Sequence, residues 1–107
     1  MINIEDFAKV EIKIGTIVSA EKIPEGEKLL KLVFDFGDEQ RQVMSGIAEF
    51  FPDPSLLVGK QMPVIVNLEP RKLRGYESQG MIMAIDKGDG IVLLKPEINV
   101  PAGSKVR

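Results

Sequence analysis

The sequence predicts an all-β domain, a small Greek-key barrel of five strands with a short helical insert and short terminal elements. Apolar and polar residues alternate in several short segments, which is typical of strands half buried in a sheet. Residues that favour turns separate these segments, and a proline-interrupted stretch follows the third of them. The 107 residues contain no internal repeat or linker, so we expect one domain covering 1–107.

The N-terminal part is predicted to form one helical turn and then a strand. Asn3 can cap the turn, with Asp6 three residues further on as a weak capping-box partner. Apolar and charged side chains alternate over 9–14, and β-type residues resume over 16–20. Gly15 lies between the two segments, and a glycine inside a strand indicates a bulge or a sharp bend.

The next two strands form a predicted hairpin. The second strand covers 29–36, the third covers 41–45, and the polar, glycine-containing stretch 37–40 connects them. Alternate side chains of the second strand are apolar and are expected to face one way. These residues are Leu30, Leu32, Phe34 and Phe36.

A helical insert and the last strands complete the predicted fold. Helical turns are expected at 48–51 and 55–58, because two prolines separate them. The fourth strand begins near Met62, the fifth near Met81, and a last short apolar strand covers 91–94. This arrangement favours the oligonucleotide-binding fold, a five-stranded Greek-key barrel. A β-sandwich is the competing architecture, and the strand pattern alone does not decide between them.

The composition excludes several kinds of chemistry. The chain has no cysteine and no histidine, which removes disulfides, the usual structural zinc site and the commonest general base. Its sixteen carboxylates show no recognisable catalytic arrangement, and its glycines lack the spacing of a phosphate-binding loop. We therefore predict a binding module that is not an enzyme and uses no metal or cofactor.

Hydropathy and charge limit where the protein is expected to be located and which ligands it is expected to bind. No apolar run approaches the roughly 18 residues that a membrane-spanning helix needs, and no signal peptide is recognisable. A cytoplasmic protein without membrane contact is therefore expected. The net charge of −2 counts against a generally basic nucleic-acid-binding domain. The charges are clustered, however, and a ligand responds to the local field.

The most informative stretch is 67–81, which we predict to be a loop held between two apolar strands. Arg71, Lys72 and Arg74 place three positive charges within four residues. A basic loop on a rigid sheet is a frequent place for function, although a charge run can also be a merely solvated surface. Three further residues are expected to shape the loop by restricting or freeing its backbone: Pro70, Gly75 and Gly80.

These residue types indicate a phosphate-binding surface. Lysine and arginine suit phosphates, and we expect Lys31 and Arg41 to point away from the apolar face of the second strand. The second and third strands form the binding face of an oligonucleotide-binding barrel. The chain has one tyrosine and no tryptophan, so recognition of the shape and backbone of a folded RNA is favoured over base stacking. The predicted binding residues are Lys31, Arg41, Asn67, Arg71, Lys72, Arg74 and Ser78.

The motifs Asn67-Leu-Glu-Pro-Arg-Lys-Leu-Arg-Gly75, Ser78-Gln-Gly-Met81 and Arg41-Gln-Val-Met-Ser-Gly46 carry a family resemblance. The sequence resembles the tRNA-binding domain shared by the C-terminal region of methionyl-tRNA synthetase, its free-standing β-subunit form, structure-specific tRNA-binding proteins and the endothelial monocyte-activating polypeptide. The resemblance implies an oligonucleotide-binding fold that binds tRNA largely regardless of the amino acid it accepts. It also implies that Met81 shapes the loop, by packing under it.

The resemblance further implies partners. The chain begins at Met1 and holds only this domain, so it is expected to be free-standing. Free-standing members of the family are homodimers joined through their terminal segments, and here 91–94 and 100–107 would supply the apolar surface. The catalytic subunit of methionyl-tRNA synthetase is another candidate partner, on which the sequence does not decide.

A second branch of the same family keeps open an alternative function. It resembles a secretion-related chaperone that has the same barrel and binds unfolded peptides. In that branch the basic loop tends to lack its second arginine, and the Ser-x-Gly-Met run is altered. This chain keeps Arg74 and Ser78-Gln-Gly-Met81, which favours tRNA as the ligand.

Overall fold

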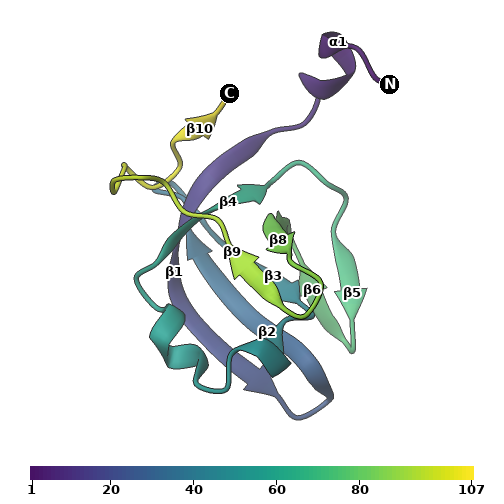
Figure 1. Ribbon diagram of the computed structural model, residues 1–107, viewed down its shortest axis with the longest axis vertical. Coiled ribbons are helices and arrows are strands. Elements are labelled where there is room, and N and C mark those ends of the chain that lie inside the picture. The colour runs from purple at the N-terminus through teal and green to yellow at the C-terminus, as the bar shows by residue number, and fades with distance from the viewer.

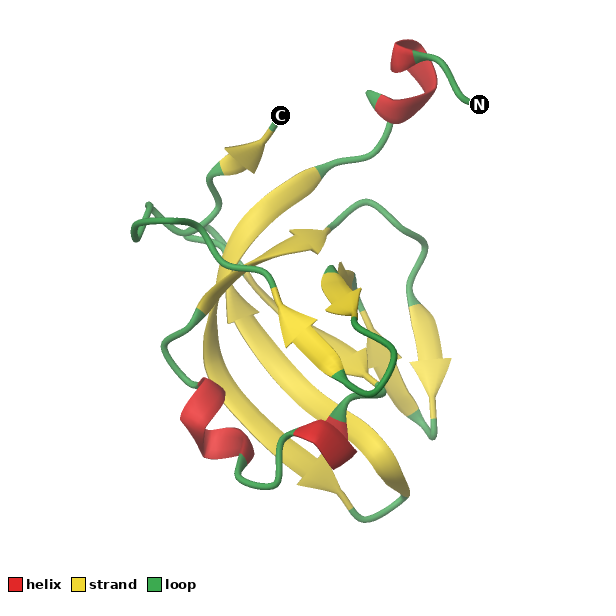
Figure 2. Cartoon of the chain, in the orientation of Figure 1, coloured by secondary structure: helices red, strands yellow, loops and turns green.

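The computed structural model describes residues 1–107 and consists mainly of strands wrapped around one core (Figures 1 and 2). None of its helices has the length and apolar composition needed to span a membrane. In chain order the elements are α1 (Ile4–Phe7), β1 (Ile12–Ile23), β2 (Gly26–Asp35), β3 (Gln40–Ser45), the 3-10 helices η1 (Ala48–Phe50) and η2 (Pro54–Leu57), β4 (Gln61–Ile65), β5 (Arg71–Leu73), β6 (Tyr76–Ser78), β7 (Met81–Ile82), β8 (Ala84–Asp86), β9 (Ile91–Leu93) and β10 (Lys105–Val106).

The barrel is built around β1, the long curved strand of Figure 1. Its first half pairs with β4 and its second half with β2, which gives the strand order β3-β2-β1-β4-β7. The free edge of β3 is bonded to the segment after β6. There, the backbone N–H of Gln79 donates to the carbonyl of Gln42 at 2.8 Å. The predicted all-β barrel is therefore confirmed.

The core lies between the two halves of the barrel and follows the predicted pattern. Leu30, Leu32 and Phe34 on β2 are completely buried, and Phe36 just beyond it is 3% exposed. They pack with Val64 of β4 and other buried residues in one cluster. Each fully buried side chain of this size contributes roughly 1.5–3 kcal/mol to folding. The alternation on β2 is thus a reliable guide to the inward face.

The bend expected at Gly15 lies three residues further on. Gly15 pairs regularly with Met62 of β4, and the register shift in the pairing of β1 with β2 falls between Ile17 and Ser19. Thr16 pairs with both neighbouring strands, so β1 exchanges one partner for the other at this point. A bulge increases local twist, which suits a strand that bends from one side of a barrel to the other.

The terminal segments leave apolar side chains exposed. The side chain of Asn3 caps α1 as predicted, accepting from the backbone N–H of Asp6 at 2.9 Å. The helix buries none of its residues and projects from the barrel (Figure 1). β10, which was not predicted because two residues carry no periodic signal, pairs with the start of β1. The predicted strand at 91–94 is β9, which pairs with β8.

Candidate nucleic-acid interface

The stretch predicted as a loop is a β-hairpin. Arg71 pairs with Ser78 and Leu73 with Tyr76. Arg74 and Gly75 form the tip with φ angles of 52° and 87°, and two positive φ angles are the requirement of a tight type I′ turn. The loop prediction was wrong because the tip reads Arg-Gly, whereas asparagine or aspartate before glycine is the usual signal.

The hairpin exposes the three basic side chains predicted to bind phosphates. Arg71, Lys72 and Arg74 are all exposed, and none of them takes part in the four ion pairs of the structure. Lys72 lies opposite Glu77 on one face of the hairpin, and Arg71 lies on the other. These three cations are therefore free to meet an external anion.

Lys31 points away from the core, as predicted, but its charge is already engaged. Its register partner on β1 is Glu21, and its Nζ lies 2.9 Å from a carboxylate oxygen of that residue. The hydrogen bond from Lys31 to Glu21 raises the pKa of the ammonium. The same Nζ lies 5.8 Å from the ring centroid of Tyr76, within the range of a cation–π contact. Lys31 thus contacts the hairpin through Tyr76 of β6.

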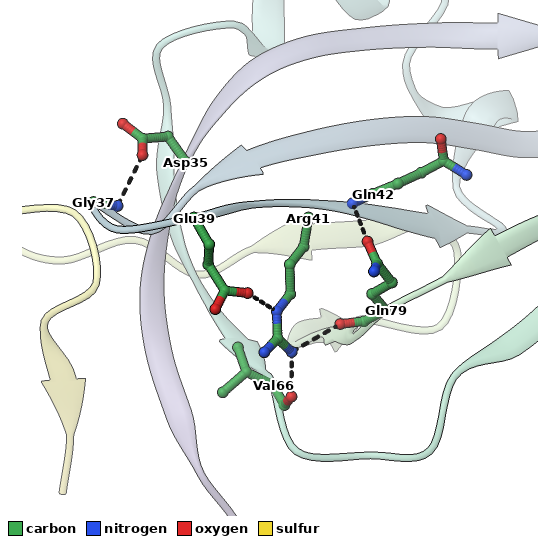
Figure 3. Close-up of polar contacts among 7 residues, drawn as sticks. All are labelled: Asp35, Gly37, Glu39, Arg41, Gln42, Val66 and Gln79. Carbon is green, nitrogen blue, oxygen red and sulfur yellow. Dashed lines mark hydrogen bonds and ion pairs between the residues drawn. The ribbon is translucent and has the colours of Figure 1, made fainter.

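Arg41 does not lie on the register that we predicted. It pairs with Phe34, and directly paired residues point to the same side of a sheet, so Arg41 shares the inward face. Its guanidinium donates to the carboxylate of Glu39 and to the backbone carbonyls of Val66 and Gln79 (Figure 3). The hydrogen bond from Arg41 also lowers the pKa of Glu39.

Asn67, in the connection before β5, and Ser78, the last residue of β6, hold the segment that carries the hairpin. The Asn67 side chain donates to the carbonyl of Lys9 at 2.6 Å and accepts from the backbone N–H of Glu11 at 2.8 Å. The hydroxyl of Ser78 is buried, accepts from the N–H of Met44 at 3.0 Å and donates to the carbonyl of Gly80 at 3.1 Å. The side-chain polar groups of both residues therefore already form hydrogen bonds with backbone groups of the chain.

The remaining predicted residues shape the hairpin base. Pro70 is exposed directly before β5. A side chain at Gly80 would bring its Cβ within 3.0 Å of the Ile65 carbonyl, so the close approach requires glycine. Met81 pairs with Ile65 and is 49% exposed. It lines a small hollow together with Arg71, which places it beside the hairpin with half of its surface uncovered.

Sequence reasoning missed the contact that secures the hairpin tip. The hydroxyl of Tyr76 donates to the carboxylate of Glu25, 51 residues away, at 3.0–3.1 Å, and this hydrogen bond raises the pKa of Tyr76. A local pattern cannot reveal so distant a pair. Beside it an open groove of about 640 Å³ is lined by three cations, Lys28, Lys72 and Arg74, and by the carboxylates of Glu25 and Glu27. Lys28 therefore adds a fourth cation to this surface.

A second groove, of about 520 Å³, is more apolar and contains none of the predicted residues. Phe51, Met62, Ile91 and Leu93 line it, together with Lys95. No group of three or more carboxylates lies close enough to hold a metal ion. The basic hairpin and the groove beside it are therefore the surface best suited to a polyanion.

An oligonucleotide-binding barrel that presents a firmly held basic hairpin defines a nucleic-acid-binding domain. The family model described as "Putative tRNA binding domain" matches residues 12–105. The chain is 55% identical to a methionine–tRNA ligase from Methanospirillum hungatei over 99% of its own length and 16% of that protein. The chain therefore belongs to this family of putative tRNA-binding domains.

Solved structures show the same fold over the whole chain. A protein described as related to methionyl-tRNA synthetase, from Pyrococcus horikoshii, has a TM-score of 0.92 and 40% identity, and the match covers 100% of this chain and 98% of that one. The CsaA chaperone of Bacillus anthracis has a TM-score of 0.88 and 30% identity, with 100% and 99% covered. The chain spans only about a sixth of the length of the ligases that it matches.

Proposed function

We propose that this chain is a non-catalytic domain that binds the backbone of folded tRNA through the β5–β6 hairpin. The observation that carries the proposal is that Arg71, Lys72 and Arg74 are exposed, unpaired and mounted on a hairpin secured at both ends. Phosphate neutralisation by such side chains provides affinity without reading sequence. Residues 1–107 act as one unit, since a single core supports the hairpin.

We further propose that the domain assists a methionyl-tRNA synthetase, either as part of it or as a separate subunit. The similarity to methionine–tRNA ligases and to the Pyrococcus protein supports this setting. The domain would act in the cytoplasm, where tRNA is charged. By binding tRNA, a non-catalytic domain raises the effective concentration of that tRNA near a linked active site.

A homodimer joined through the terminal segments is also proposed. Ile4, Phe7 and Val106 line an open groove of about 400 Å³ between α1 and β10, and all three are substantially exposed. Contiguous exposed apolar surface favours association. β9 was also expected to contribute to the dimer interface. It offers less exposed apolar surface, because Ile91 and Leu93 pack against the core.

Peptide binding is the second candidate function, and one observation favours it. The apolar groove lined by Phe51, Met62, Ile91 and Leu93 lies in a chain that is structurally similar to the CsaA chaperone. Apolar grooves suit apolar peptide side chains. We rank this function second, because the hairpin cations have no role in it.

The test is equilibrium binding of tRNA across a series of salt concentrations. Three phosphate contacts predict a log–log slope of roughly −2 to −3, and Arg74→Ala should flatten it by about one. Lys95→Ala, which removes an exposed lysine from the other groove, is the matched control and should bind as wild type does. If Arg74→Ala binds tRNA with unchanged affinity and slope, the hairpin is only a solvated surface.

A further inference from the structure

One guanidinium joins the two ends of the segment that carries the basic hairpin. Val66 directly follows β4, five residues before β5 begins, and Gln79 directly follows β6, so these two residues form the base of that segment. Arg41 on β3 donates from a single nitrogen, Nη1, to the backbone carbonyls of both residues. Figure 3 shows this nitrogen between the two carbonyl oxygens.

Neighbouring contacts fix Arg41 in this position. Its Nε donates to Glu39, which lies in the turn directly before β3. The next residue, Gln42, accepts from the backbone N–H of Gln79, and its own N–H donates to the Gln79 side chain at 3.1 Å. The Arg41 side chain is only 27% exposed. Its Nε and Nη1 are already engaged in hydrogen bonds, so a phosphate that approached Arg41 would compete with these contacts.

We propose that Arg41 is a positioning residue for tRNA binding, which clamps the base of the hairpin and so sets where Arg71, Lys72 and Arg74 lie. This inference rests on the proposed function of the hairpin. A planar guanidinium can donate in several fixed directions at once, whereas a lysine ammonium is a compact point charge on a flexible stem. The clamp uses two nitrogens of this planar group, because Nε donates to Glu39 while Nη1 donates to the two backbone carbonyls.

The proposal predicts a separation between affinity and salt dependence. A residue that neutralises a phosphate contributes to the number of released counterions, so its loss flattens the slope. A residue that positions other cations leaves those cations in place, so its loss weakens binding with little change in slope. Because tRNA must then order the loosened hairpin when it binds, Arg41→Ala should weaken tRNA binding by about 10- to 100-fold.

The experiment compares Arg41→Ala and Arg41→Lys with Lys72→Ala in the salt series, together with amide hydrogen exchange of each protein. Both Arg41 variants should lose affinity at an unchanged slope, and Lys72→Ala should flatten it by about one. Amides of β5 and β6 should exchange faster in the Arg41 variants, while those of β1 and β2 stay protected. Arg41→Lys keeps the charge and most of the stem, so it carries the test if Arg41→Ala does not fold.

Two results would overturn the proposal. One is a flatter slope for Arg41→Ala with unchanged hairpin exchange, which would make Arg41 a phosphate contact. The other is recovery of wild-type affinity in Arg41→Lys, which would show that charge alone matters. Failure of the proposed function looks different: Lys72→Ala and Arg74→Ala would then both bind tRNA as wild type does.

Discussion

The seven residues predicted to bind RNA divide into two groups by what their polar atoms already do. Arg71, Lys72 and Arg74 have no partner within the chain. The other four, namely Lys31, Arg41, Asn67 and Ser78, are bonded to residues that support the hairpin. Composition and spacing identify residue types suited to phosphate, but burial and partners decide which of them remain available.

Ser78→Ala should destabilise the fold more than it affects tRNA contacts. The substitution leaves the backbone N–H of Met44 without its acceptor, and an unsatisfied buried donor costs roughly 1–3 kcal/mol. Urea unfolding measures the change, with Ser19→Ala on the outer face of β1 as the control. Equal stability of Ser78→Ala and wild type would show that the hydroxyl does not tie the hairpin to β3.

At the scale of elements, the hairpin depends on the conformation of its tip. Gly75 has a φ of 87° with open space around it, so a side chain there meets backbone strain and no clash. Left-handed backbone costs a residue with a Cβ roughly 1–2 kcal/mol.

Gly75→Ala should therefore loosen the hairpin and weaken tRNA binding without disturbing the barrel. Hydrogen exchange of the β5 and β6 amides measures the loosening. Gly46→Ala is the control, since its φ is not positive and the nearest atom to the added Cβ is 4.0 Å away. Unchanged exchange in Gly75→Ala would contradict the idea that glycine at the tip keeps the hairpin in shape.

The elements also show how far sequence reasoning reached. The alternation of apolar and polar residues over 29–36 predicted β2 and its buried face, because the side chains on one side of that strand all pack into the hydrophobic core. The hairpin at 71–78 was missed because its side chains do not alternate regularly between apolar and polar. Both of its faces are partly exposed to solvent and partly in contact with protein. The inward register of Arg41 could not be predicted either, because only the distant carbonyls of Val66 and Gln79 explain a partly buried guanidinium.

For the whole molecule, the exposed apolar termini predict self-association. Light scattering at micromolar concentration should give the mass of a dimer, and Phe7→Asp should shift it toward a monomer by placing a charge in the groove between α1 and β10. Leu56→Asp, at an exposed position of η2 outside the terminal segments, is the control and should remain dimeric. A monomeric wild type would exclude the proposed dimer.

The molecule as a whole carries a net charge of −2, so tRNA must be attracted to one part of it and repelled by others. The hairpin carries three exposed cations without an ion-pair partner, and two of them, Lys72 and Arg74, line an open groove with Lys28, Glu25 and Glu27. The groove beside β9 is more apolar and is lined by two lysines, Lys60 and Lys95. The two candidate ligands, tRNA and an unfolded peptide, are therefore expected at different places on the surface.

Amide chemical-shift mapping of the labelled chain with added tRNA tests this account most directly, since it locates the ligand without altering any residue. We predict that the shifts concentrate in β5, β6 and the turn around Lys28. Residues of the apolar groove, including Phe51 and Leu93, should change little. Shifts confined to the apolar groove, with the hairpin unaffected, would contradict the account and place the tRNA-binding surface in that groove.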